Sequence, residues 1–314
     1  MKITLKAALA ATAAVAALAV PMAASAHRPW FVPSATNFSG NDPWVTVDAA
    51  ISNDLFYADH FPMQLGNVKA IGPQGEDLKL ENSVVGRYRS TFDVHLTQPG
   101  TSRVLTVSNG VQGTYVNDGK TYRLGGGRGG PPPAPGAQGP GGPGAGPQGP
   151  GPQAAGGPPA GGPGGRPQTL QGVAEPSQIP AGSTEIKLVQ TSARNETFIT
   201  RGAPTPIKLS NQGLELTDGG TAPTDLVADE PASLKLLMDG KPAADVEVTV
   251  VPADQRFQSE LPEQKIKTGA DGVFKVTWPR AGYYWINATA NAAGTIPNAT
   301  RRASYTATLE VQKP

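Results

Sequence analysis

Hydrophobic and polar residues alternate with a period of two over many short segments of the chain, and turn-forming residues separate these segments. Phe92, Val94 and Leu96, for example, fall on one face of their segment. Asp93 and His95 fall on the other face. This pattern is typical of half-buried strands in an all-β protein. The predicted strands are 44–50, 68–71, 91–96, 104–107, 185–189, 196–200, 213–216, 234–237, 246–251, 264–267, 273–278, 283–286 and 305–311.

Two dipeptides predict reversals of the chain. Asn109-Gly110 follows the predicted strand 104–107 and is a strong turn signal, so we expect this strand to end there. Asp271-Gly272 lies between two further predicted strands, 264–267 and 273–278, and predicts a hairpin between them.

The composition changes sharply between residues 125 and 168. Of the 43 residues from 125 to 167, 19 are Gly and 13 are Pro, and no apolar side chain is larger than Ala or Pro. Such a segment buries too little apolar surface to offset the conformational entropy that is lost on ordering. The sequence therefore predicts a disordered Gly/Pro-rich insertion over about 125–168.

The remaining strands predict two β-sandwich domains of immunoglobulin-like or prealbumin-like type. The two or three strands that follow the insertion are too few for a sandwich of their own, so we expect them to complete the first domain. The predicted division is an N-terminal sandwich over 27–222, which contains the insertion, and a C-terminal sandwich over 223–314.

Residues 1–26 have the pattern of a secretory signal peptide. Lys2 and Lys6 begin the segment, an apolar run follows, and the small residues Ala24 and Ala26 precede the expected cleavage site. The apolar run is too short to span a bilayer and no later segment is longer. We therefore expect a periplasmic or secreted protein that is not inserted in the membrane after cleavage.

Charge and composition exclude several classes of function. The formal net charge of +1 becomes −1 when Lys2 and Lys6 are removed, so there is no basic excess to bind nucleic acid. The chain has no Cys, which rules out disulfides and thiolate metal sites. It also lacks a Gly-x-Ser-x-Gly elbow, a His-Glu-x-x-His motif and a phosphate-binding loop, so no hydrolytic or nucleotide-dependent enzyme is predicted.

The candidate chemistry lies in the histidines. Cleavage after Ala26 would make His27 the first residue, and its α-amine and ring Nδ1 could then chelate one metal ion. The chain has three histidines, and the other two are His60 and His95. We expect these three residues to form a transition-metal site, with Asp93 as a possible carboxylate ligand. Nickel or copper suits such nitrogen-rich ligands, and cobalt or zinc is acceptable.

The ordinary structural interpretations stay open for each ligand. Asp93 and His95 could simply form a solvated strand face, and His60 could pack among the aromatic residues of its loop. His27 could follow the cleavage site without any role.

A series of short motifs, in a fixed order, resembles a bacterial family of exported proteins of unknown function that is often described as NikM-like. The motifs are Ala26-His27-x-x-Trp30 with Pro33, Asp54-Leu55-Phe56, Pro99-Gly100, Glu196-Thr197-Phe198, Gly213-Leu214-Glu215-Leu216, Gly240-Lys241-Pro242, Thr268-x-x-Asp271-Gly272 and Gly282-Tyr283-Tyr284-Trp285. The resemblance implies an accessory role in nickel or cobalt uptake, with His27 as a metal ligand. It also implies a C-terminal sandwich similar to carboxypeptidase regulatory modules.

These observations lead to one main hypothesis and two alternatives. The main hypothesis is a periplasmic protein that captures nickel or cobalt, or else copper, for a membrane transporter that is a separate chain. One alternative is a copper-dependent oxidative enzyme that uses the N-terminal His chelate. The other is a structural or adhesive module of the cell surface.

Overall fold

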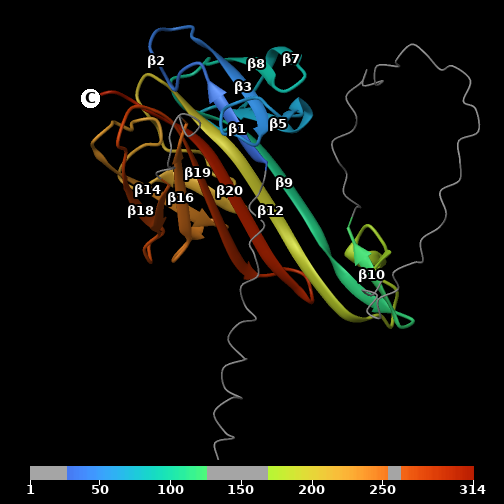
Figure 1. The fold of residues 1–314 in the computed structure, drawn as a ribbon. Helices are drawn as coiled ribbons and strands as arrows, with labels where there is room; N and C mark the ends of the chain where they lie inside the picture. The colour runs from blue at the N-terminus through green and yellow to red at the C-terminus, as the bar shows by residue number, and fades with distance from the viewer. Residues whose placement is uncertain (1–26, 126–168, 254–262) are drawn as a thin grey trace, which may run out of the picture.

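The structure is a computed structural model that describes residues 27–125, 169–253 and 263–314. The predicted signal peptide and residues 126–168 of the predicted insertion lie outside the described residues. The described chain is almost entirely β-strand, in three sheets, which confirms the all-β prediction (Figure 1). Its two helices are single 3₁₀ turns, η1 (Leu65–Asn67) and η2 (Pro176–Gln178). In the described ranges, no helix has the length and apolar character needed to cross a membrane.

Each sheet draws strands from distant parts of the sequence. Sheet A is formed by β1 (Arg28–Pro33), β3 (Trp44–Ser52), β8 (Ser90–His95) and β7 (Glu81–Val85) in that order, with β4 (Phe61–Pro62) on β3. Sheet B has the order β11 (Leu170–Gln171), β10 (Lys120–Leu124), β9 (Gly100–Asn117), β12 (Thr184–Arg201), β20 (Ala299–Val311), β19 (Gly282–Ala293), β16 (Glu247–Pro252) and β17 (Gln264–Lys267). Three short strands extend sheet B, namely β2 (Asn37–Phe38), β5 (Val68–Ile71) and β6 (Asp77–Leu78). Sheet C is formed by β13 (Leu214–Asp218), β14 (Pro231–Met238), β15 (Lys241–Pro242) and β18 (Val273–Thr277).

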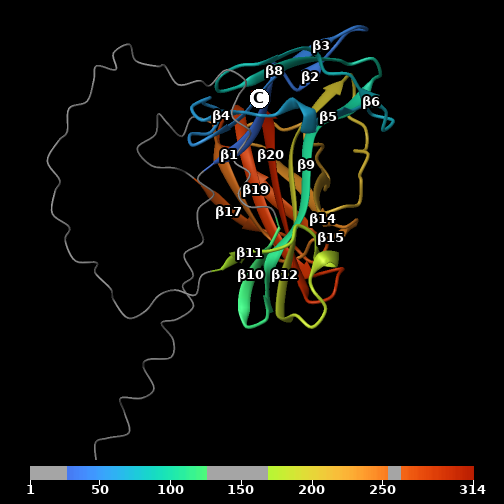
Figure 2. The ribbon, with the colours of Figure 1, turned by 90° about the vertical axis from the view of Figure 1, so that its right-hand side faces the viewer.

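Sheet B is the central layer of the molecule, and the other two sheets pack on its opposite faces. Neighbouring residues of a strand point to opposite faces, and on β12 Ile199 packs in one core while Phe198 packs in the other. The first core lies between sheets A and B and includes Phe31, Val47 and Phe92. The second core, larger and centred on sheet C, lies on the other side. Figure 2 shows sheet A at one end of the long strands, and β10 and β11 at the other.

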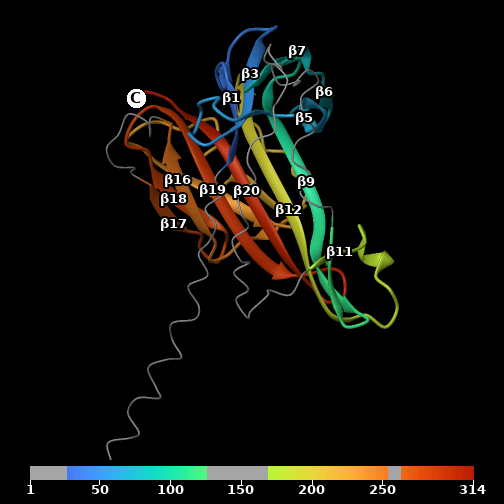
Figure 3. The same cartoon turned by 45° about the vertical axis from the view of Figure 1, so that its right-hand side comes forward.

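The two predicted sandwiches therefore share one sheet. β12, from the predicted N-terminal sandwich, pairs in parallel with β20, from the predicted C-terminal sandwich, between Leu188↔Ala299 and Thr197↔Thr308. Figure 3 shows β9, β12, β20 and β19 side by side in this shared layer. The strand predicted at 213–216 appears as β13, and it pairs with β14 in sheet C rather than with strands of the first sandwich.

The predicted turn at Asn109-Gly110 is wrong. β9 continues through both residues to Asn117, and Gly110 lies opposite Thr191 of β12. Because β12 pairs with β9 in one continuous antiparallel register from Gly100 to Thr114, the long-range pairing overrides the local turn preference.

The predicted hairpin at Asp271-Gly272 is also wrong, although the turn exists. Gly272 has a φ of +79° and donates a backbone hydrogen bond to the Gly269 carbonyl at 2.9 Å. The strands on either side, however, enter different sheets, because β17 pairs with β16 and β18 pairs with β14. The turn therefore carries the chain from sheet B to sheet C.

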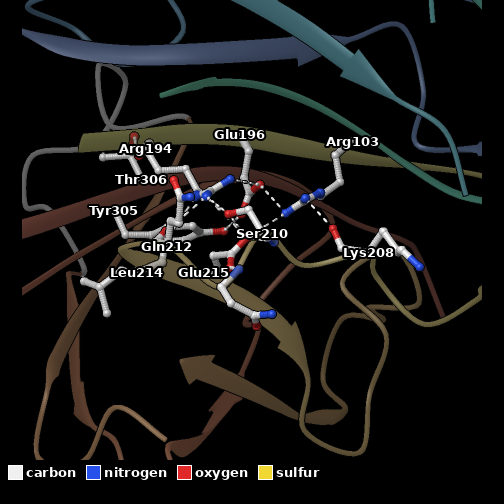
Figure 4. A network of polar contacts seen from close by, with 11 residues as sticks. Arg103, Arg194, Glu196, Lys208, Ser210, Gln212, Leu214, Glu215, Tyr305 and Thr306 are labelled. Atoms are coloured by element: carbon white, nitrogen blue, oxygen red, sulfur yellow. Dashed lines mark hydrogen bonds and ion pairs between the residues drawn. The ribbon is translucent and has the colours of Figure 1, made fainter. Parts of the chain in front are cut away.

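A buried network of charged side chains connects sheets B and C (Figure 4). Arg103 of β9 lies 3.4 Å from Glu196 of β12 and 3.2 Å from Glu215 of β13. Arg194 lies 3.8 Å from Glu196 and 3.3 Å from Glu215, and the Tyr305 hydroxyl donates to Glu196 at 2.7 Å. All of these side chains are at most 6% exposed. Two positive and two negative charges thus balance one another between the layers.

The two carboxylates of the network differ in their environment. Burial raises the pKa of Glu196, although both guanidinium groups and Tyr305 act against this shift. Burial acts in the same direction on Glu215, but hydrogen bonds from Ser210 and the charge of Arg194 outweigh it, so the pKa of Glu215 lies below its ordinary value. Both the backbone N–H and the hydroxyl of Ser210 donate to Glu215, at 2.9 and 3.0 Å.

We predict that Glu196→Gln lowers the free energy of unfolding by about 3–5 kcal/mol, because it leaves two buried guanidinium groups beside one carboxylate and so one positive charge uncompensated. The matched control is Glu247→Gln, since Glu247 is 54% exposed and lies 4.0 Å from Lys265. The control should cost less than about 1 kcal/mol. Urea unfolding of the three proteins measures both values, and equal losses would show that the network has no special role.

We also predict that Glu215 makes the protein sensitive to acid. Its folded-state pKa lies below the ordinary 4.5, so its contribution to stability is complete above that pH and is lost as the pH falls through the folded value. The free energy of unfolding should therefore decrease less steeply in Glu215→Gln than in the natural sequence, from about pH 5 downward. Glu196 is present in both proteins, but the loss of the Glu215 charge removes one of the causes that raise the pKa of Glu196. Identical pH profiles would contradict this assignment.

Candidate metal site

The segment that carries His27 is fixed by contacts on both sides. β1 begins at Arg28, directly after His27, and pairs with β3 in the register Arg28↔Ser52. The indole N–H of Trp30 donates to the Ser52 hydroxyl at 2.7 Å. These contacts place His27 at the Ser52 end of β3.

Two aromatic residues of β19 hold the same segment from the side of sheet B. The indole N–H of Trp285 donates to the Pro29 carbonyl at 3.1 Å, and the Arg28 guanidinium lies 5.7 Å from the centre of the Trp285 ring. The Tyr283 hydroxyl donates to the Pro33 carbonyl at 2.5 Å, and burial raises the pKa of Tyr283. These residues therefore pack against β1.

His60 reaches the same place from the loop between β3 and β4. The Asp59 carboxylate accepts hydrogen bonds from the backbone N–H groups of Asn53 and Asp54, at 2.9 and 3.4 Å. Although slight burial acts to raise the pKa of Asp59, these backbone hydrogen bonds keep it below the ordinary value. Leu55 is 1% exposed and anchors the loop in the small core that contains Trp30 and Trp285.

The structure brings the rings of His27 and His60 together. Their centroids are 4.0 Å apart and their planes differ by 21°, so the two imidazoles are stacked. Phe61 lies beside them, with its ring centroid 3.9 Å from that of His60. His27 is exposed and His60 is half-buried. Among the described residues, Nε2 of His60 is buried and has no hydrogen-bond partner.

His95 and Asp93 lie elsewhere, so the expectation that all four predicted ligands meet is not fulfilled. His95 pairs with Trp44 at the opposite end of the nine-residue strand β3 from the Arg28↔Ser52 pair. At about 3.3 Å per residue, this separation is about 26 Å. One metal ion cannot bind His27 and His95 at such a distance.

Both of these residues have other partners on the outer face of sheet A. His95 stacks on Trp44, with centroids 4.4 Å apart and planes 2° apart, and its Nε2 lies 2.5 Å from a carboxylate oxygen of Asp42. Asp93 accepts hydrogen bonds from Thr46 at 2.6 Å and Asn82 at 2.8 Å, which lower its pKa. The alternation of β8 is as predicted, but this outer face is a cross-strand polar network.

The donors that remain for a metal are those of His27 and His60. In the described part of the chain, no group of three or more His, Cys, Asp or Glu side chains is arranged to hold a metal ion. If cleavage follows Ala26, however, the His27 α-amine adds a third nitrogen beside the two rings. This set fits a transition metal by its chemistry and by the unpartnered Nε2 of His60. The rings would have to rotate from their stacked arrangement, because an imidazole lone pair lies in the ring plane.

Sequence reasoning missed the roles of Trp285 and of the buried charge network. The period-two spacing of Tyr283 and Trp285 places both side chains on one face of their strand, but it does not indicate that this face meets β1. Glu196 lies in the predicted strand 196–200, whereas Arg103 and Arg194 lie outside the predicted strands, and nothing in their spacing shows that they meet Glu215.

Comparisons with known proteins show similarity to two solved structures and membership of one sequence family. Among solved structures, it is similar to the D0-D1 domain of Intimin, with 12% sequence identity, 90% of this chain and 96% of that chain covered, and a TM-score of 0.20. It is also similar to trypsin-activated alpha-2-macroglobulin from Escherichia coli, with 10% identity, 90% of this chain but 15% of that chain covered, and a TM-score of 0.20. TM-scores this low carry no conclusion about the fold or function of this chain.

No curated protein sequence matches this chain significantly. The model of one family, described as "Domain of unknown function (DUF4198)", matches residues 24–292. This match covers most of the chain, including all three histidines and every strand from β1 to β18. The chain therefore belongs to the DUF4198 family.

Proposed function

We propose that this protein is an exported transition-metal-binding protein that captures nickel or cobalt, or else copper, and passes it to a membrane transporter that is a separate chain. The observation that carries the proposal is the stacking of His27 on His60, with ring centroids 4.0 Å apart. His27 would bind through its α-amine and Nδ1, and His60 through a ring nitrogen. His95 and Asp93 have no part in this site.

The nature of the donors supports the choice of metal. Three nitrogen donors favour the tetragonal or planar geometries of Ni(II) and Cu(II) over the all-oxygen geometries of Mg²⁺ and Ca²⁺. The resemblance to NikM-like proteins supports nickel or cobalt within this group. The chain has no Cys, so thiolates do not compete for the metal.

The position of the site supports capture and delivery rather than permanent storage. His27 is exposed, and its segment precedes the first strand of sheet A. Two side chains and one amine leave coordination positions open, so a ligand from a receiving protein could join the metal before this chain releases it. A fully enclosed site would offer no such path.

We predict that the mature chain, starting at His27, binds one equivalent of Ni(II), Co(II) or Cu(II). His60→Ala or His27→Ala should weaken the affinity more than about tenfold, because each removes one imidazole from the site. The matched control is His95→Ala, which removes a histidine about 26 Å from His27 and should leave affinity unchanged. Isothermal titration measures the affinity, and the rise in melting temperature with added metal gives a second measurement.

The outcomes separate the competing functions. Equal losses in His60→Ala and His95→Ala would reject the site. A clear preference for copper, with peroxide-dependent cleavage of a polysaccharide, would favour the oxidative enzyme. Failure of all three metals to bind would favour a structural or adhesive module.

We further predict that Trp285 positions His27 for metal binding. Trp285→Phe keeps a ring under Arg28 but removes the hydrogen bond to the Pro29 carbonyl, two residues from His27. The metal affinity should fall by about threefold to tenfold. The control is Trp278→Phe, since Trp278 is fully buried in the opposite core and its indole N–H has no partner among the described residues. A loss of affinity in both variants would indicate a general effect of stability instead.

A further inference from the structure

A pocket of about 450 Å³ lies on the face of sheet B that also carries sheet C. This volume falls within the range of small-molecule sites. The floor is formed by alternate residues of three neighbouring strands, namely Asn109 and Val111 of β9, Gln190 and Ser192 of β12, and Arg301 of β20. Asn109 belongs to the dipeptide whose turn preference β9 overrides, and its place within the strand brings it to this pocket.

The Ser192 hydroxyl is the strongest indication that a ligand binds in this pocket. Ser192 is 7% exposed, and its hydroxyl has no hydrogen-bond partner among the described residues. A Cβ atom at Gly213 would lie 2.6 Å from this oxygen, so the glycine leaves space beside it. A buried polar group without a partner is costly, and most such groups bind water or a ligand. The hydroxyl is therefore an unused donor and acceptor at the floor of the pocket.

Two amide side chains add further unused groups. The side chains of Asn109 and Gln212 form no hydrogen bond within the part of the chain that the structure describes. Their backbones are nevertheless held, because Asn109 lies in the ladder of β9 and β12, and the Gln212 carbonyl accepts a hydrogen bond from Arg194 at 3.2 Å (Figure 4). Gln190, by contrast, already donates to the Thr295 hydroxyl at 2.9 Å. The pocket thus combines fixed walls with amides that are free to bind.

The charges of the pocket favour a neutral ligand. The Arg301 guanidinium forms an ion pair with Asp239, so its charge is already balanced. Glu175 also lines the pocket. An anion would be repelled by this carboxylate, and a cation by the guanidinium. An apolar ligand would leave the amides and the hydroxyl without partners.

The position of the unused groups favours a sugar over a peptide. An extended peptide usually binds through main-chain hydrogen bonds to an open strand edge. The unused groups of this pocket are side chains that stand on the face of the sheet. They suit a compact ligand with many hydrogen-bonding groups.

We propose that this pocket binds one sugar unit that carries no charge. Each sugar hydroxyl is both donor and acceptor, and so are the amides of Asn109 and Gln212 and the hydroxyl of Ser192. The guanidinium of Arg301 has five N–H groups, and those that do not bind Asp239 can donate to sugar oxygens. Val111 offers an apolar surface to the C–H groups of the ring.

Saturation-transfer NMR on the mature, metal-free protein measures this binding. The probes are glucose, galactose and mannose, with the corresponding uronates and 2-amino sugars as charged counterparts. We expect at least one neutral sugar to bind saturably, with a dissociation constant of about a few millimolar for so small a ligand. Its charged counterparts should bind at least about threefold more weakly. Methyl glycosides distinguish two sources, because equal binding assigns the terminal unit of a glycan and weaker binding assigns a free sugar.

Ser192→Ala should weaken the binding by about threefold to tenfold, because it removes one hydrogen bond to the ligand. Its melting temperature should not fall, since the hydroxyl has no partner within the described ranges. The matched control is Ser108→Ala. Ser108 is exposed and precedes Asn109 on β9, so it lies on the opposite face of sheet B, and its loss should leave the affinity unchanged.

Three results would overturn the proposal. One is the absence of saturable binding for every neutral sugar, another is equal or tighter binding of a charged counterpart, and the third is the same loss of affinity in Ser192→Ala and Ser108→Ala. Binding of triglycine in place of the neutral sugars would assign the pocket to peptides instead. The test uses no metal, so its result is independent of the proposed metal function.

Discussion

The parallel pairing of β12 with β20 is the interaction on which the rest of the structure depends. It runs for ten residue pairs, from Leu188↔Ala299 to Thr197↔Thr308, and joins segments more than 100 residues apart in the chain. β9 pairs with the other side of β12 and β19 with the other side of β20, and these four strands form the centre of sheet B. Sheets A and C then cover its two faces. Such non-local pairing loses much chain entropy before it gains contacts, so large apolar cores on both faces must offset that loss.

The buried charges lie where this pairing meets sheet C. Arg194 and Glu196 on β12, Arg103 on β9 and Tyr305 on β20 all contact one another or Glu215 of β13. A balanced network of this kind adds little net stability, because the desolvation of four charges offsets their attraction. A shifted register would leave buried charges unpaired at high cost. The network therefore discriminates between the native arrangement of layers and its alternatives.

The candidate metal site depends on the same architecture. β1 lies between β3 of sheet A and the aromatic residues of β19, so His27 is placed by strands from both ends of the chain. His60 comes from a loop whose Leu55 packs in the core shared with Trp285. The orientation of the two histidines is thus linked to the contact between sheets A and B. The proposed exchange of metal ligands at the surface would therefore shift the contact between sheets A and B through the hydrogen bond from Trp285 to the Pro29 carbonyl.

The sequence by itself determined the all-β class, the faces of strands such as β8 and the residue types available for metal chemistry. These are local properties, because alternation with a period of two assigns each side chain to a face without reference to any partner strand. Only the tertiary structure decided which strands pair. The sequence therefore predicted a turn at Asn109-Gly110 where β9 continues, and a hairpin at Asp271-Gly272 where the turn joins two different sheets. For the same reason, only the tertiary structure shows that His95 lies far from His27 and that His60 lies next to His27. Distances between residues far apart in sequence follow from strand register, and long-range packing and hydrogen bonding choose that register.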